Sequence, residues 1–163
     1  MKFSIILMLC AVSVFCKAQT TDELILKIRK EYNTISAGLK TYKKTNTKLD
    51  GDNIVSYQDK NGLYRAIFKT STSSTNKEFY EYYYNDEQRL IFCYLKVVSI
   101  KAQPKAKNAK PANSIIFKYY VNDNEVIRKT NAANKEQTLG DNETALLTED
   151  AQKCMDFVGG GGD

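Results

Sequence analysis

The side chains that most often carry out catalysis are scarce in this chain. Its 163 residues include no histidine, which excludes Ser-His-Asp and Cys-His catalysis and removes the commonest zinc ligand. There is also no Cys-x-x-Cys pair and no glycine-rich phosphate-binding loop that opens a helix. The sequence therefore predicts a protein that is not an enzyme and that needs no cofactor and no metal ion.

Carboxylates are the remaining side chains with chemical potential. Asp50 and Asp52 have the spacing that opens a calcium-binding loop, but Ile54 stands where the third oxygen ligand is needed, so we expect a turn. Glu78 and Glu81 lie on one predicted strand, where their spacing places them on opposite faces. They are therefore not expected to act together as an acid and a base.

Tyrosine is the most unusual feature of the composition, with eleven residues. Tyr80, Tyr82 and Tyr84 share one face of a predicted strand, and Tyr119 is expected nearby. Aromatic rows of this kind stack on sugar rings or bases, which makes these four residues candidate ligand contacts. The alternative is that tyrosine, a good strand former, packs here beneath a helix or across strands.

A lysine-rich segment holds both prolines of the chain, Pro104 and Pro111. Proline lacks the donor of a strand ladder and lysines repel one another, so this segment is predicted to be an exposed loop. It either contacts an anionic surface or is merely solvated. The candidate contacts are Lys101, Lys105, Lys107 and Lys110.

The amino end has the three parts of a secretory signal peptide. Lys2 precedes an apolar run over residues 3–16, and Ala18 supplies the small residue before cleavage. A membrane anchor is the alternative, but a spanning helix needs about 20 apolar residues. We therefore predict a signal peptide at residues 1–18, a lipid anchor being disfavoured because Leu9 and Phe15 precede the cysteines. The mature protein is then periplasmic or secreted.

Two cysteines, Cys93 and Cys154, remain after such cleavage. An even pair in an oxidising compartment favours a disulfide, although two buried free thiols are also compatible with the sequence. Cys93 lies on a predicted strand and Cys154 on the apolar side of a predicted helix, which is the structural reason to favour the bond.

An amphipathic helix is predicted over residues 20–44. Thr20 and Glu23 have the spacing of a capping box, and apolar residues recur every three or four positions as far as Tyr42. A second helix is predicted from Asn142 to Val158, with Leu147, Ala151 and Cys154 on its apolar line. The glycines at 159–162 end it and begin a flexible tail.

Between the helices the pattern changes to strands and turns. Residues 82–86 and 119–123 are similar copies at an offset of 37, and Asn61-Gly62 marks a further hairpin. The strand from Leu90 has apolar side chains on both of its faces, so we expect it to be central in the sheet and covered on at least part of both faces. The fold class predicted is α+β: a meandering antiparallel sheet of about six strands, in three hairpins, flanked by the two helices. A single domain is expected over residues 19–158.

The combined pattern resembles a family of small exported proteins of unknown function from Bacteroidota and related bacteria. The residues that carry the resemblance are structural: Ile28–Ile35, Glu81–Asp86 with Leu90–Phe92, and Tyr119–Asp123. The resemblance implies an envelope or secreted protein with a twisted antiparallel sheet and flanking helices. It supplies no catalytic residues.

The sequence thus predicts a non-catalytic binding or interaction protein of the cell envelope, acting on an unknown protein or small ligand. The net charge of +5 falls to +3 (22 basic against 19 acidic residues) when Lys2 and Lys17 leave with the signal peptide, which is too small to indicate nucleic acid, and no transmembrane segment is expected. We expect a monomer or weak oligomer. One alternative is an exported inhibitor of a lysozyme or protease, presenting Asn85–Glu87 or Lys105–Lys110. Another is a carboxylate-based enzyme acting on glycans.

Overall fold

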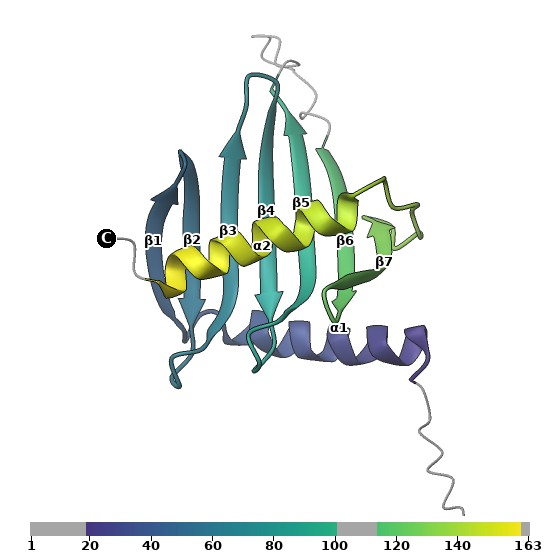
Figure 1. Ribbon diagram of the computed structural model, residues 1–163, viewed down its shortest axis with the longest axis horizontal. Helices are drawn as coiled ribbons and strands as arrows, with labels where there is room; N and C mark the ends of the chain where they lie inside the picture. The colour runs from purple at the N-terminus through teal and green to yellow at the C-terminus, as the bar shows by residue number, and fades with distance from the viewer. Residues whose placement is uncertain (1–18, 101–113, 161–163) are drawn as a thin grey trace, which may run out of the picture.

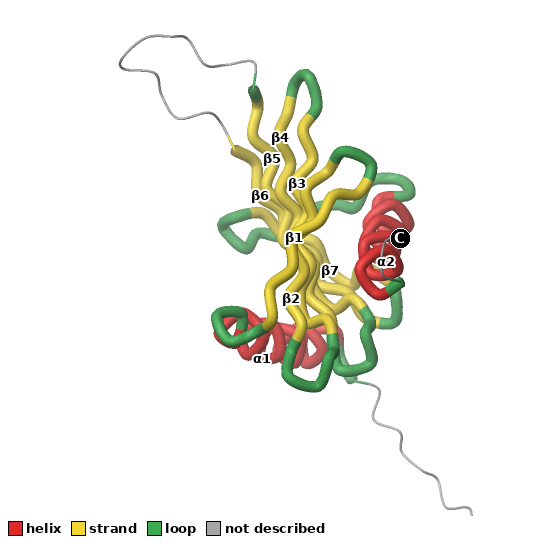
Figure 2. The backbone as a smooth tube through the Cα atoms, turned by 90° about the vertical axis from the view of Figure 1, so that its left-hand side faces the viewer, coloured by secondary structure: helices red, strands yellow, loops and turns green. Residues whose placement is uncertain are grey.

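The computed structural model describes residues 19–100 and 114–160. These residues form seven antiparallel strands in one sheet, with one helix on each face (Figures 1 and 2). The strands lie in the sheet in chain order, from β1 at one edge to β7 at the other. The predicted α+β meander is confirmed, with seven strands instead of six. The elements are α1 (Thr21–Gly38), β1 (Lys43–Leu49), β2 (Asp52–Gln58), β3 (Tyr64–Thr72), β4 (Asn76–Tyr84), β5 (Leu90–Ser99), β6 (Ser114–Asn122), β7 (Glu125–Asn131) and α2 (Glu143–Gly159).

Several sequence predictions fall outside the described residues. They are the signal peptide at 1–18, the candidate lysines Lys101, Lys105, Lys107 and Lys110, and the last three residues of the predicted tail. Within the part of the chain that is described, no helix is long and apolar enough to cross a membrane.

Helix α1 begins at the predicted capping box. The Glu23 amide donates to the Thr20 hydroxyl, and the Thr20 amide donates to the Glu23 carboxylate. The helix ends at Gly38, earlier than the predicted residue 44. The side chain of Tyr42 folds back over Gly38, where a Cβ atom would lie only 2.6 Å from the tyrosine hydroxyl. Glycine at this position therefore leaves room for the Tyr42 side chain.

Strand β1 is the strand that the sequence pattern missed. Its residues Lys43–Leu49 are mostly exposed and show no apolar alternation. The strand is held by its pairing with β2, through a turn in which Asp50 and Gly51 both have positive φ angles (52° and 92°). The predicted turn at Asp50–Asp52 is present, but it joins two strands instead of a helix and a strand.

The two faces of the sheet bury separate cores. On one face, Tyr82, Cys93 and Tyr119 lie side by side on β4, β5 and β6 and pack beneath α2. On the other face, their chain neighbours Tyr83, Phe92 and Tyr120 pack against α1. Strand β5 is therefore central and covered on both faces, as its sequence predicts.

Helix α2 matches its predicted position closely. It begins after Asn142 and ends at Gly159, and the predicted line of Leu147, Ala151 and Cys154 is buried against the sheet. Gly160 follows as the C-cap. In Figure 1 the helix runs across the strands, and its acidic residues bond to β3 and β4 through Asp150 and to β6 through Glu143.

The predicted disulfide is wrong. Cys93 and Cys154 are both free thiols, and each has an exposed fraction of 0%. Both fill space in the core beneath α2, as small apolar side chains do. Burial raises the pKa of the Cys93 thiol and raises that of Cys154 to about 12, which disfavours the thiolate needed for disulfide formation.

Candidate functional site

An open pocket of about 310 Å³ lies between α2 and the middle strands of the sheet. Strands β3, β4, β5 and β6 supply its floor, and one side of α2 supplies its wall. Side chains of both polar and apolar character line it: Lys69, Ser71, Glu78, Tyr80, Tyr82, Leu95, Tyr119, Glu143, Leu146, Leu147 and Asp150. This pocket, called the α2 pocket below, contains three of the four tyrosines that the sequence singles out.

The first polar anchor of the pocket is the carboxylate of Asp150 on α2. It accepts hydrogen bonds from the Lys69 ammonium on β3 and from the Tyr82 hydroxyl on β4. Lys69 also lies 3.4 Å from the carboxylate of Asp52. Burial alone would lower the pKa of Lys69, but the hydrogen bond and the charge of Asp150 outweigh it, and the pKa is raised. The lysine is therefore held charged between two carboxylates.

The second polar anchor has the same kinds of partner on the other side of β5, from strands β6 and β7. Glu143 on α2 accepts a hydrogen bond of 2.7 Å from the Tyr119 hydroxyl, and the Lys129 ammonium lies 2.7 Å from it. The Gly140 amide donates to the same carboxylate at 2.7 Å. Burial opposes ionisation of Glu143, yet these bonds together lower its pKa below the usual value. The Glu143 carboxylate is therefore ionised and bonded to three groups of the protein.

The two anchors follow the internal repeat of the chain. Tyr82 and Tyr119 are equivalent residues in the two similar hairpins, and each donates its hydroxyl to an acidic residue of α2. Glu143 and Asp150 are seven residues apart, so two helical turns, roughly 10 Å, separate them along the same side of α2. Glu143 and Asp150 thus hold α2 against the sheet on both sides of β5, and the Tyr84 hydroxyl adds a bond to the Ala151 carbonyl.

A third carboxylate that lines the pocket, that of Glu78, is not paired with a lysine or arginine among the described residues. Glu78 accepts a hydrogen bond of 2.8 Å from the Tyr80 hydroxyl, two residues along β4. Within the described residues, Glu78 forms no salt bridge. It is half-buried between Ser71 of β3 and Val97 of β5. Among the described residues, Glu78 is therefore the pocket carboxylate that has no lysine or arginine within salt-bridge distance.

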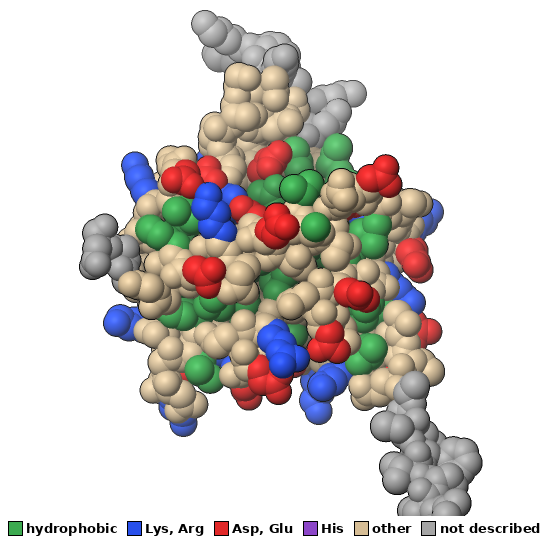
Figure 3. All heavy atoms as spheres, in the orientation of Figure 1, with side chains coloured by type: hydrophobic (Ala, Val, Ile, Leu, Met, Phe, Trp, Pro, Cys, Tyr) green, Lys and Arg blue, Asp and Glu red, His purple; other side chains and the backbone are tan. Residues whose placement is uncertain are grey.

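An apolar surface continues from the pocket toward the ends of the strands. Leu95 lies opposite Phe117, and Val97 lies opposite Ile115, so these residues of β5 and β6 form a block. Leu146 of α2 lines the pocket beside it and is 65% exposed, and Ile115 is 55% exposed. In Figure 3, hydrophobic side chains gather above α2 over these strand ends. The five residues are called the β5–β6 patch below.

The predicted tyrosines have different surroundings. Tyr80 is half-buried at the pocket, with its ring stacked on that of Tyr82 at 5.7 Å between centroids. Tyr82 and Tyr119 line the pocket but are buried, and their hydroxyls are bonded to α2. Tyr84 does not line the pocket, and its hydroxyl donates to the carbonyl of Ala151 at 2.9 Å. Tyr80 is thus partly exposed at the pocket, whereas Tyr82, Tyr84 and Tyr119 are packed in the core beneath α2.

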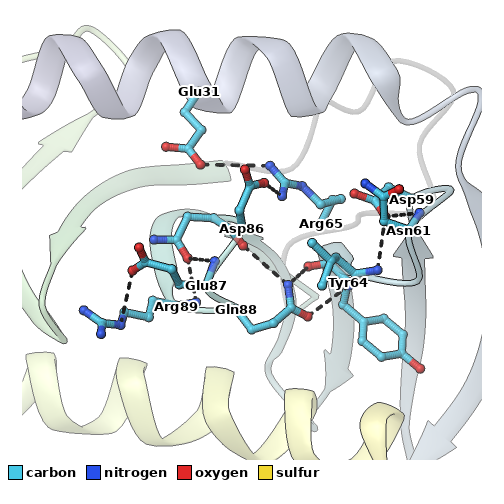
Figure 4. Close-up of polar contacts among 11 residues, drawn as sticks. Glu31, Asp59, Asn61, Tyr64, Arg65, Asp86, Glu87, Gln88 and Arg89 are labelled. Carbon is cyan, nitrogen blue, oxygen red and sulfur yellow. Dashed lines mark hydrogen bonds and ion pairs between the residues drawn. The ribbon is translucent and has the colours of Figure 1, made fainter.

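The β4–β5 turn, the candidate inhibitory segment, lies at the opposite end of the strands. The Asn85 side chain accepts hydrogen bonds from the amides of Glu87 and Arg89, which fixes the turn locally. The Gln88 side chain bonds to both backbone groups of Tyr64 on the neighbouring strand (Figure 4). The turn is therefore rigid.

An arginine on the neighbouring strand β3 also binds the turn. Arg65 of β3 pairs with Asp86, and Glu31 of α1 lies 4.0 Å from the same guanidinium (Figure 4). The Asp86 and Glu87 side chains are nevertheless 83% and 68% exposed. The turn thus presents two carboxylates to solvent on a fixed backbone.

Sequence reasoning missed the acidic side of the pocket. Glu143 and Asp150 share a helix side with Leu147, and that spacing was the available signal.

No group of three or more histidine, cysteine or acidic side chains suited to a metal ion occurs in the described ranges. Comparison with protein-family models, curated proteins and solved structures finds no match to this chain. The resemblance to a Bacteroidota family therefore stays a prediction.

Proposed function

We propose that this protein is a non-catalytic binding protein that holds a small ligand with an apolar body in the α2 pocket. The observation that carries the proposal is the open pocket itself, with tyrosine and leucine side chains on its walls and the β5–β6 patch beside it. Small-molecule sites are typically concave and mostly apolar, with a few fixed polar groups. The α2 pocket has this composition.

The state of two of the three carboxylates that line the pocket, Glu143 and Asp150, favours binding over catalysis. A general acid needs a pKa near the working pH, and a general base needs a free carboxylate in reach of the substrate. Glu143 has a lowered pKa, and both Glu143 and Asp150 are paired with a lysine and a tyrosine. These two acids are engaged in holding α2 in place.

The site of action that we propose is outside the cytoplasm, in the periplasm or the medium. This part of the proposal rests on residues 1–18, whose charged start, apolar run and small residue at Ala18 are typical of a signal peptide. A ligand of the cell envelope is the natural class for such a protein.

Two exposed leucines provide a matched test. Leu146 at the pocket is 65% exposed and Leu26 on α1 is 64% exposed, so Leu146→Asp and Leu26→Asp make the same change at equally exposed helical sites. With the neutral dye Nile red as probe, we expect L146D to weaken binding about tenfold or more, since a buried leucine contact contributes about 1.5–3 kcal/mol. L26D should bind as the parent protein does.

Either of two results would contradict the proposal. The first is a protein that does not bind the dye at all. The second is equal binding by the L146D variant and the parent protein, which would place the dye at another surface. Circular dichroism of both variants checks that the fold is intact.

A second candidate, an exported hydrolase inhibitor, is favoured by the rigid β4–β5 turn. A fixed backbone that presents Asp86 and Glu87 to solvent loses little conformational freedom on entering a cleft. Inhibition of a lysozyme or serine protease that is lost in Glu87→Ala and retained in L146D would support this candidate. No inhibition at micromolar concentrations would count against it.

A further inference from the structure

We infer that the ligand of the α2 pocket is a cationic amphiphile, with an ammonium-type head that pairs with Glu78 and an alkyl or aryl body that lies on the β5–β6 patch. This inference rests on the proposed function and adds the chemical class of the ligand to it. It follows from the charges around the pocket and from the position of Glu78 relative to the apolar residues.

The charges of the pocket lining are unbalanced toward the negative. Glu78, Glu143 and Asp150 line the pocket with a single lysine, Lys69. Lys69 is shared between Asp150 and Asp52, and Glu143 has its own partner in Lys129. The carboxylate left over is that of Glu78, which accepts a hydrogen bond only from the Tyr80 hydroxyl among the described residues. A positively charged group is its natural complement.

The apolar body has a place directly beside this carboxylate. Val97 is the cross-strand neighbour of Glu78 on β5, and Ile115 is the neighbour of Val97 on β6. Side chains directly opposite one another in an antiparallel sheet lie about 5 Å apart. The alkyl chain of a ligand whose head pairs with Glu78 would therefore lie over Val97 and Ile115. It would reduce the exposed fraction of Ile115, which is 55%.

The surroundings of the pocket favour the same sign of charge. The whole chain carries a net charge of +5, yet acidic side chains are spread over the face that α2 covers (Figure 3). Lys153, a basic residue of α2, is paired with Asp50 at 2.7 Å. Three acidic side chains and one lysine line the pocket, and an excess of one sign of charge around a cleft raises the local concentration of the opposite ion. The excess of acidic side chains at the pocket is thus a local feature that would attract a cationic ligand.

Strand β4 offers a closely matched control. Glu81 lies on the same strand and accepts a 2.8 Å hydrogen bond from the tyrosine two residues on, Tyr83, as Glu78 does from Tyr80. It points to the opposite face, which α1 covers, and it does not line the pocket. Glu78→Gln and Glu81→Gln therefore remove the same charge from equivalent local geometry, and only the first should change binding.

The test compares three probes of equal chain length: n-octylammonium, 1-octanol and octanoate. Amide chemical shifts of Ser71, Tyr80 and Val97 report binding at the pocket by NMR. We expect n-octylammonium to bind about tenfold more tightly than 1-octanol at low salt, and octanoate to bind most weakly. In E78Q the preference for the ammonium should disappear, while in E81Q it should persist.

The outcomes separate this inference from the proposed function. Equal binding of n-octylammonium and 1-octanol, or a preference that survives in E78Q, would overturn the cationic ligand but leave the pocket as a site for neutral ligands. Failure of all three probes to shift the pocket amides, together with no dye binding, would overturn both.

Discussion

Replacing Asp150 by alanine should destabilise the protein substantially, because this carboxylate joins α2 to two strands. It accepts hydrogen bonds from Lys69, whose side chain is 14% exposed, and from Tyr82, which is 0% exposed. Hydrogen bonds to a charged group contribute about 1.5–3 kcal/mol each, and a buried hydroxyl left without a partner carries a further cost. Lys69 keeps Asp52 as a second partner at 3.4 Å, which limits the loss. We therefore expect Asp150→Ala to lower the free energy of unfolding by about 3 kcal/mol.

Urea unfolding followed by circular dichroism measures this change. A double-mutant cycle with Tyr82→Phe isolates the hydrogen bond. Tyr82→Phe alone should cost about 1.5 kcal/mol, and in the Asp150→Ala background it should cost close to nothing, because its acceptor is already gone. Glu149→Ala is the control: Glu149 is an exposed acid next to Asp150, and its loss should change the free energy by less than about 0.5 kcal/mol.

Two results would contradict this role of Asp150: a small change in the free energy of unfolding, or additive changes in the double-mutant cycle. If Asp150→Ala costs no more than Glu149→Ala, the carboxylate does not hold α2. If Tyr82→Phe costs the same in both backgrounds, the tyrosine and the aspartate are not coupled, and the wall of the pocket is not fixed as described.

Three further predictions concern stability and reactivity. Burial raises the pKa of Glu81, so its ionised form opposes folding at neutral pH, and stability should rise as the pH falls through the folded-state pKa toward the unfolded value near 4.3. Glu81→Gln should therefore raise the free energy of unfolding at pH 7. The gain should be no more than about 1 kcal/mol, because solvent at the open side of Glu81 screens part of its charge. The variant should also show a flatter dependence of stability on pH, and an unchanged profile would contradict this prediction. In the native protein, iodoacetamide should not modify Cys93 or Cys154, and in guanidinium it should modify both without prior reduction. An increase in the mass of the intact protein by two hydrogens on reduction would show instead that the two thiols are bonded. Thr20→Ala should lower the unfolding free energy by about 1 kcal/mol through loss of the capping box, and Thr21→Ala, one residue on, serves as its comparison.

The parts of the fold that follow local rules could be predicted from the sequence. The capping box of Thr20 and Glu23, the buried line of α2 and the central position of β5 all depend on residues within one element, whose spacing is visible in the chain. Strand β1 could not be predicted, because Lys43–Leu49 lacks an apolar face and is stabilised by its neighbour β2. Edge strands rich in lysine carry little period-2 signal for this reason.

The pocket was predictable only in part. The row of Tyr80, Tyr82 and Tyr84 indicated an aromatic face, but which of these side chains lines a cavity depends on where α2 crosses the strands. The pairing of Glu143 and Asp150 with Tyr119 and Tyr82 also depends on that crossing. The state of the cysteines was decided likewise by packing, since each occupies an apolar site in the core beneath α2.

The most direct test of the central claim is to map binding by NMR with a library of small neutral and charged aromatic and aliphatic fragments. We expect the amides shifted by the binders to cluster at Ser71, Leu95 and Leu147 around the α2 pocket. Shifts that cluster instead at the β4–β5 turn, or that are scattered without a common site, would contradict it.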